Sequence, residues 1–160
     1  MEQQVELRAS GATSLAAPDL EPAWENAPRV AMLGSWPPFP GISAYCFELA
    51  HAVGRNAKLD YISFSRMYPD FLYPGGACSR DHSFPPADPE RVRLRQSLNW
   101  YNPLGWVWEG MRPGADVLHA QFWSLPLAPI IGTVMAGWRL RRKPCVLTIH
   151  NAESHDRRAP

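Results

Sequence analysis

The sequence predicts an α/β fold built on a doubly wound parallel sheet, and two segments carry this prediction. Residues 116–151 and residues 29–65 each read as an apolar strand, an amphipathic helix and a second apolar strand. Parallel neighbouring strands need a crossover connection of considerable length, which is usually a helix. The 160 residues are enough for one such domain with its own hydrophobic core.

The first of these units follows an N-terminal tail. Val30–Leu33 is continuously apolar, as is typical of a strand buried on both faces. Three prolines make residues 34–41 a loop, after which Ser43 is expected to cap a helix that ends near Arg55. One face of this helix carries the apolar positions Cys46, Leu49, Ala50 and Val53. The second strand of the unit is expected over residues 59–65.

The segment between the two units is irregular over residues 67–89, where it holds five prolines and a Gly-Gly pair. A loop of this length inside a domain is usually functional or mobile. Pro89 can open a helix at its first turn, and we expect that helix over residues 91–98. Pro103 interrupts it, and a second helix is expected over residues 104–111.

The second unit consists of a strand from Asp116, a helix over residues 126–142 and a strand that ends at His150. Apolar residues of the helix share one face: Ile131, Val134, Met135 and Trp138. The last turn of the helix is basic, which suits the negative pole of the helix dipole.

Polar side chains stand at the ends of these last two strands. They are His119, Gln121 and Trp123 on the first strand and His150 and Asn151 at the end of the second. In open α/β sheets, ligands bind in the crevice beyond the carboxyl ends of the strands. We therefore expect these five side chains to converge on one ligand site.

Composition and charge narrow the class of protein. Hydrophobic residues make up 46% and charged residues 19% of the chain, and the net charge of +1 gives no support for a nucleic-acid partner. The polar N-terminus lacks a signal-peptide core, and the most apolar window, residues 125–138, is shorter than a membrane span. We expect a soluble cytoplasmic protein with a disordered tail at residues 1–28, and we leave a peripheral membrane contact open.

Motifs typical of several enzyme classes are missing from the sequence. It has neither the HExxH nor the CxxC spacing of zinc sites, and no GxSxG turn that would carry a serine nucleophile. It also lacks the GxGxxG fingerprint of NAD enzymes and the Walker loop of P-loop ATPases. We therefore expect neither a metal ion nor a bound cofactor.

Four passages resemble one enzyme family when they are taken together in order and spacing. They read RVAMLGSWPPFPGISAYCFELAHAV, FSRMYPDFLYPGG, NPLGWVWEGMRPGADVLHAQFW and PCVLTIHNAESHD. The chain resembles the N-terminal domain of family 4 glycosyltransferases, the retaining GT-B enzymes. The resemblance covers residues 29–156 and implies transfer of a sugar from a nucleotide-sugar donor to an acceptor hydroxyl.

The resemblance also implies an architecture. Enzymes of this family have two Rossmann-like domains that face each other across a cleft, the first holding the acceptor and the second the sugar nucleotide. We expect residues 29–156 to be the acceptor-side domain, with its sheet incomplete at the C-terminus and the donor-binding domain absent. An uncovered last strand would expose apolar surface and favour self-association. The chain alone is then expected to be inactive.

The resemblance assigns roles to individual residues. Gly41, with Ile42, matches the loop that approaches the donor phosphate, where a residue without Cβ allows close contact and a helix N-terminus favours an anion. Pro40 stands where many members have a second glycine. His150 matches the family's histidine at the catalytic centre, and an imidazole suits the recognition of sugar hydroxyls. The alternatives are an ordinary strand-to-helix turn and a histidine that satisfies buried backbone.

The acceptor is expected to contact His119, Gln121, Trp123 and Asn151. The alternative for Trp123 is packing against the following helix, a common role for tryptophan. Two other functions remain open. The chain can be a non-catalytic module that binds a sugar or another partner, or the acceptor half of a split enzyme whose donor domain is a separate chain.

Overall fold

The computed structural model describes residues 27–39, 41–69, 71–72, 84–85 and 88–150. Its centre is an all-parallel five-stranded sheet with the strand order β3-β2-β1-β4-β5. The strands are β1 (Arg29–Leu33), β2 (Lys58–Arg66), β3 (Val92–Asn99), β4 (Val117–Phe122) and β5 (Cys145–Ile149). The helices are α1 (Ser43–Gly54), α2 (Pro103–Met111) and α3 (Ala128–Leu140), with the short 3-10 helix η1 (Leu125–Leu127) before α3.

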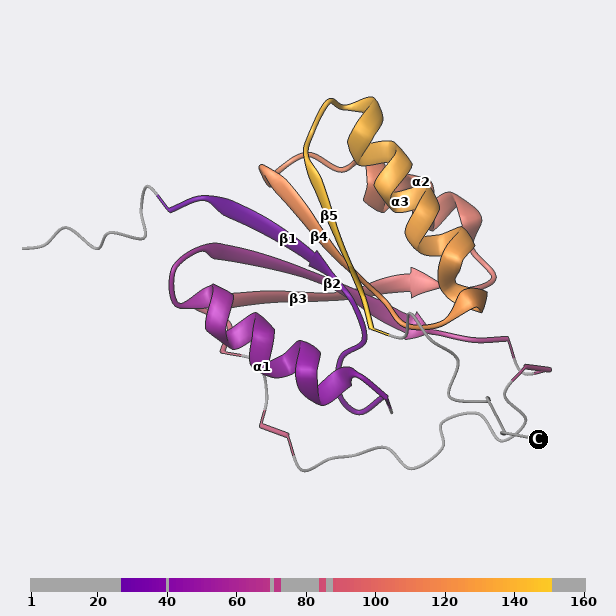
Figure 1. Ribbon diagram of the computed structural model, residues 1–160, viewed down its shortest axis with the longest axis horizontal. Helices are drawn as coiled ribbons and strands as arrows, with labels where there is room; N and C mark the ends of the chain where they lie inside the picture. The colour runs from indigo at the N-terminus through magenta and orange to yellow at the C-terminus, as the bar shows by residue number, and fades with distance from the viewer. Residues whose placement is uncertain (1–26, 40, 70, 73–83, 86–87, 151–160) are drawn as a thin grey trace, which may run out of the picture.

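Helices lie on both faces of the sheet, with α1 on one face and α2 and α3 on the other (Figure 1). This confirms the predicted α/β parallel sheet and gives it a Rossmann-like arrangement. The predicted tail lies almost wholly outside the described residues, and β1 begins at Arg29 as the sequence predicts.

The strand β1 is the centre of the sheet because it pairs with β2 on one side and with β4 on the other. Ala31, Met32 and Leu33 are all buried, which confirms the prediction of a strand covered on both faces. Met32 belongs to the core beside α1, and Leu33 belongs to the core beside α3.

The helix α1 lies where the sequence predicts it, but its predicted cap is wrong. Ile42 is the N-cap residue and makes no side-chain capping bond, whereas Ser43 is the first helical residue and is buried. Of the predicted apolar face, Cys46 and Ala50 are buried and the other two positions pack against the same core. Phe47 is also buried there, so the covered face is wider than the predicted stripe.

The predicted helix over residues 91–98 is wrong, because this segment is the edge strand β3. Val92 packs in the core beside α1, whereas Leu98 packs in the core beside α3. The two residues face opposite ways because the register with β2 shifts between Ser63 and Phe64. The sequence keeps a two-residue alternation here, with Val92, Leu94 and Leu98 at every second position, so a strand signal was present. The arginines between the buried positions suit an edge strand, which charged side chains protect from further pairing.

Pro103 opens α2 rather than interrupting a helix, because the segment before it is a strand. Asn102 caps α2 by accepting a hydrogen bond from the backbone N–H of Gly105 at 3.1 Å. This confirms the predicted second helix. The predicted long helix of the second unit is also confirmed, except that its first turn is η1.

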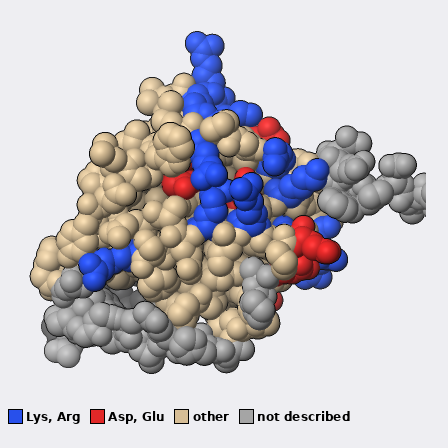
Figure 2. Space-filling model, turned by 180° about the vertical axis from the view of Figure 1, so that it is seen from behind, with Lys and Arg blue, Asp and Glu red and all other residues tan. Residues whose placement is uncertain are grey.

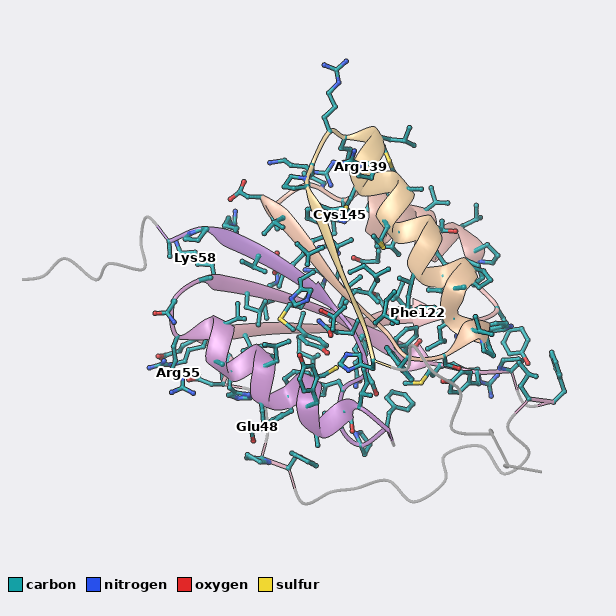
Figure 3. The ribbon with its side chains drawn as sticks, in the orientation of Figure 1. Glu48, Arg55, Lys58, Phe122, Arg139 and Cys145 are labelled. Atoms are coloured by element: carbon teal, nitrogen blue, oxygen red, sulfur yellow. The ribbon has the colours of Figure 1, made fainter. Side chains whose placement is uncertain are left out.

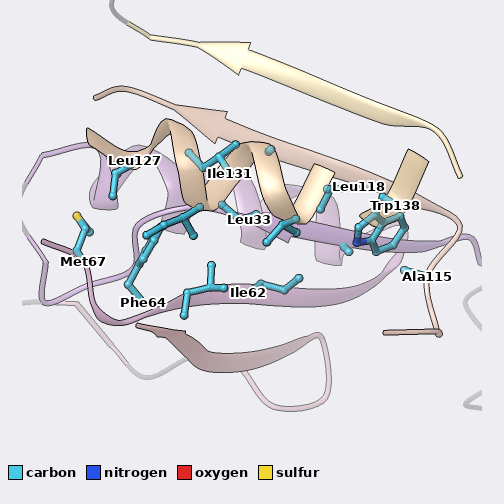
Figure 4. Packing of buried hydrophobic residues seen from close by; sticks show 14 residues of the cluster. Leu33, Ile62, Phe64, Met67, Ala115, Leu118, Leu127, Ile131 and Trp138 are labelled. Atoms are coloured by element: carbon cyan, nitrogen blue, oxygen red, sulfur yellow. The ribbon is translucent and has the colours of Figure 1, made fainter. Parts of the chain in front are cut away.

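The larger core lies between the sheet and α3 (Figure 4). It includes Leu33, Ile62, Phe64, Met67, Ala115, Leu118, Leu127, Ile131 and Trp138. The predicted apolar face of α3 supplies much of this core, since Ile131, Val134 and Trp138 are all buried. The helix α2 packs against α3 at the glycines Gly110 and Gly137, whose backbones approach closely. This core fixes the strands whose carboxyl ends carry the candidate site.

Candidate functional site

The candidate site lies at the carboxyl ends of the central strands, where the strand order reverses between β1 and β4. In open parallel sheets this switch point is where ligands bind. Gly34 follows β1 there, and the start of α1 lies beyond the loop that Gly34 begins. Gln121 is near the end of β4, and His150 directly follows β5.

Two of the predicted histidines are joined through Gln121. Gln121 Nε2 lies 3.0 Å from His119 Nε2, and Gln121 Oε1 lies 2.8 Å from His150 Nε2. Thr148 Oγ1 on β5 lies 2.8 Å from the same nitrogen of His119. The parallel register places Gln121 opposite Thr148, so the strand pairing itself assembles this group. We call these four residues the His-Gln-His network.

The directions of these hydrogen bonds follow from the chemistry of the amide. An amide nitrogen only donates and an amide oxygen only accepts. Gln121 Nε2 therefore donates to an unprotonated His119 Nε2, and His150 Nε2 donates to Gln121 Oε1. Gln121 is fully buried, and both ends of its amide are engaged by imidazoles. A neutral His150 held this way carries its free lone pair on Nδ1.

The surroundings favour the neutral form of both histidines. Burial lowers the pKa of His119 below its usual value, and the charge of His150 lowers that pKa further. Burial also lowers the pKa of His150. A neutral imidazole on each side matches the hydrogen-bond directions, because His119 Nε2 must accept from the amide.

The ring of His150 contacts the first turn of α1. The rings of Tyr45 and His150 meet edge to face with their centroids 4.8 Å apart. The first hydrogen bond inside α1 runs from Cys46 N–H to the carbonyl of Ile42, so the preceding N–H groups have no partner within the helix. The first turn has no acidic residue and no side-chain cap. This helix end can therefore receive an anion next to His150.

Gly41 precedes this helix end with a φ of 90°. L-residues rarely adopt this conformation, which explains a glycine at this position. A Cβ at Gly41 would meet open space, so the backbone conformation and not crowding requires the glycine. The predicted phosphate loop, Gly41 and Ile42, directly precedes the helix turn whose Tyr45 contacts the predicted catalytic residue His150.

Gly34 packs directly against the network, and the sequence analysis did not identify it. A Cβ at Gly34 would lie 2.6 Å from Tyr61 Oη and 3.2 Å from Gln121 Cγ. Tyr61 Oη donates a hydrogen bond to the carbonyl of Ser35 at 2.8 Å. Burial raises the pKa of the Tyr61 phenol well above its usual value, so the hydroxyl stays a donor. These contacts form the floor beneath Gln121.

Trp123 lies apart from the network. Its ring meets Phe64 edge to face at a centroid distance of 6.1 Å, and it packs on the core beside α3. His119 and Gln121 share one face of β4, whereas Trp123 lies beyond the end of β4 at Phe122. Asn151 lies outside the described residues. Of the predicted acceptor contacts, the structure therefore brings together His119 and Gln121.

Two further residues of the site, Thr148 and Tyr45, are not predicted from the sequence. Thr148 stands two residues before His150, so strand alternation places it on the face toward His119, and this signal was available. Tyr45 gave no signal, because its contact with His150 depends on how α1 crosses the sheet. Within the described part of the chain, no group of three or more His, Cys, Asp or Glu side chains could hold a metal ion.

A separate hollow of about 600 Å³ lies at the opposite, amino edge of the sheet. Arg55 and Lys58 mark this edge in Figure 3, whereas Phe122 marks the edge with the network. The hollow is lined by Arg29, Gly54, Arg55, Ala57, Lys58, Leu59, Asp60, Glu90, Arg91 and Arg93. Parallel sheets bind ligands at the other edge, so we place the functional site at the network.

Comparison of the chain with protein-family models, with curated proteins and with solved structures gives no match.

Proposed function

We propose that this chain is the acceptor-side, GT-B-like domain of a retaining glycosyltransferase. The observation that supports this best is the contact between Tyr45 and His150. It places a neutral, oriented imidazole beside an uncapped helix N-terminus at the switch point of a Rossmann-like sheet. A nucleotide-sugar donor requires both features, because its diphosphate is an anion and its sugar carries hydroxyls.

The reaction breaks the bond between the anomeric carbon of the sugar and a diphosphate oxygen. A new bond forms from that carbon to the acceptor oxygen on the same face, and the proton of the acceptor hydroxyl passes to the departing diphosphate. The helix end at Gly41 and Ile42 would stabilise the negative charge that develops on the diphosphate. His150 Nδ1 can accept a hydrogen bond from a sugar hydroxyl, and its lowered pKa keeps that lone pair available at neutral pH.

Within this proposal Gln121 is a positioning residue. Its amide accepts from His150 Nε2 and so directs the opposite nitrogen of that ring outward. A buried partner that fixes the tautomer of a functional histidine is common in metal and protease sites. His119 supports the amide from the other side, since its Nε2 accepts from Gln121 and also lies 2.8 Å from Thr148 Oγ1. His119, Trp123 and Asn151 remain proposed acceptor contacts.

The test is hexosyl transfer by the protein purified from its native source with any partner chain it retains. A mixture of nucleoside-diphosphate hexoses is supplied, and release of nucleoside diphosphate is measured with and without sugar acceptors. His150→Ala is expected to lower the rate by about 10²- to 10⁴-fold. His51→Gln is the matched control, because His51 lies on α1 and hydrogen-bonds its own helix at Phe47.

Two outcomes would contradict the proposal. Equal losses in both variants would show that the histidine matters only for folding. Binding of a saccharide without transfer would instead support the non-catalytic binding module. Transfer that needs a second chain would support the split enzyme, in which His150 keeps the proposed role.

A further inference from the structure

The outer side of α2 carries a ridge of exposed apolar side chains. Leu104, Val107, Trp108 and Met111 are 81%, 49%, 68% and 45% exposed. Their spacing is i, i+3, i+4 and i+7, so they form one stripe along the helix. We call these four residues the α2 ridge. Isolated apolar residues on a surface are ordinary, but a contiguous stripe marks an interaction site.

The exposed side of α2 carries no charged side chain. The only charged side chain of α2 is Glu109, which is 2% exposed and points inward. It forms ion pairs with Arg95 at 3.3 Å and with Arg112 at 3.7 Å. The acidic group is therefore neutralised beneath the helix, and the outward side presents only apolar and uncharged groups.

The helix α2, which carries the ridge, is fixed in place by close packing against α3. A Cβ at Gly137 would lie 2.7 to 2.9 Å from backbone atoms of Gly110, so the two helices are in backbone contact there. Leu125 on η1 and Leu140 on α3 are 80% and 78% exposed on the same helical layer. The helical layer thus exposes large apolar side chains in addition to the α2 ridge.

Cations gather at one end of this helical layer. Figure 2 shows Lys and Arg in a band beside a broad surface with few charged residues. The last turn of α3 supplies Arg139, and the residues that follow α2 and α3 supply Arg112, Arg141, Arg142 and Lys143. Two of these cations have acidic partners, since Lys143 pairs with Asp116 at 3.3 Å and Arg112 pairs with Glu109 at 3.7 Å. We call the five cations the basic rim.

We propose that the α2 ridge and the basic rim form a docking surface for an anionic lipid membrane. An exposed ridge with leucine and tryptophan suits the boundary between headgroups and acyl chains, where aromatic side chains are enriched. Cations next to such a ridge are attracted to anionic headgroups. The proposed contact is with the membrane surface, and no helix in the described residues is long and apolar enough to cross a bilayer.

The charge distribution favours lipid over a protein partner. Cations beside exposed apolar side chains complement a surface that presents anionic headgroups above an apolar layer. The net charge of +1 conceals this asymmetry, because the five cations of the rim lie together at one end of the layer. The docking surface does not rest on the proposed glycosyltransferase activity, and its test uses no substrate.

The experiment is co-sedimentation of the full 160-residue chain with lipid vesicles. One set contains phosphatidylcholine alone, and the other contains phosphatidylglycerol as well. We expect binding to the anionic vesicles that weakens as salt is raised. The double variant L104S/W108S is expected to lose about tenfold or more of this affinity, because burying either side chain is a large part of the driving force.

Phe71→Ser is the matched control, since Phe71 is 75% exposed and lies outside the ridge. It should bind as the natural chain does, and circular dichroism checks that all variants keep their helices. The proposal is overturned if the natural chain ignores anionic vesicles, if it binds neutral ones equally well, or if L104S/W108S binds unchanged. Self-association without lipid that L104S/W108S abolishes in sedimentation velocity would show that a second copy occupies the ridge.

Discussion

The contact between α2 and α3 allows a sharp test with two alanine substitutions in one helix. Gly137 and Gly132 both lie in α3, but their surroundings differ. A Cβ at Gly137 would lie 2.7 Å from the carbonyl carbon and 2.8 Å from the Cα of Gly110. These are backbone atoms, so no side chain can move aside and the helices must separate. A Cβ at Gly132 would meet nothing within 4 Å.

The magnitudes follow from these surroundings. Alanine replaces glycine in a helix with a gain of about 1 kcal/mol in the free energy of unfolding, which Gly132→Ala should show in full or large part. Overpacking of a close contact costs about 1–3 kcal/mol. The close approach to backbone atoms places Gly137→Ala near the upper limit, so we expect a net loss of about 2 kcal/mol.

The assay is urea unfolding followed by far-ultraviolet circular dichroism, with the slope of the transition compared between variants. Gly132→Ala should shift the midpoint to higher urea, and Gly137→Ala should shift it to lower urea. Equal shifts of both urea midpoints in the same direction would refute the account of helix packing, because helix propensity alone would then explain both variants. A Gly137→Ala protein as stable as the natural one would show that α2 does not sit against α3.

The remaining predictions concern the network and its floor. Gln121→Glu is expected to raise the pKa of both His119 and His150, because a buried carboxylate favours the imidazolium form. The measurement is titration of the imidazole signals in NMR spectra, and unchanged pKa values would contradict the prediction. In the natural chain both histidines have a lowered pKa, so the unfolded chain binds more protons than the folded chain. The free energy of unfolding should therefore fall as pH drops below about 6.5. A urea midpoint that stays constant between pH 7.5 and about 6 would contradict the lowered pKa values. Tyr61→Phe leaves the carbonyl of Ser35 without its donor, and a loss of about 1–2 kcal/mol is expected in urea unfolding; no loss would mean that the hydrogen bond contributes nothing.

The sequence predicts those elements whose apolar pattern is regular. The continuous run at β1 and the helical periodicities of α1 and α3 each lead to the observed element. The prediction of a helix at β3 rests on Pro89, which can occupy the first turn of a helix, whereas Val92, Leu94 and Leu98 alternate with polar residues as in a strand. Pairing with β2 decides which face these residues cover, because Val92 lies in the core beside α1 and Leu98 in the core beside α3.

The candidate site was predicted in part for a similar reason. That His119, Gln121 and His150 converge follows from the rule that parallel strands end at one edge, and their hydrogen bonds show that they do. Their order within the site does not follow from that rule, because the register between β4 and β5 makes Gln121 the buried link. The position of Tyr45 depends on the placement of α1, which no local pattern encodes.

The central claim is that ligand binds at the edge of the sheet where α1 begins next to His150. The most direct measurement is titration of the labelled chain with a nucleoside diphosphate, followed by amide signals in ¹H–¹⁵N correlation spectra. We predict shifts at Gly41, Ile42 and Tyr45, with Arg55 and Lys58 at the opposite hollow unchanged. Shifts at the hollow alone, or none at either edge, would contradict the claim.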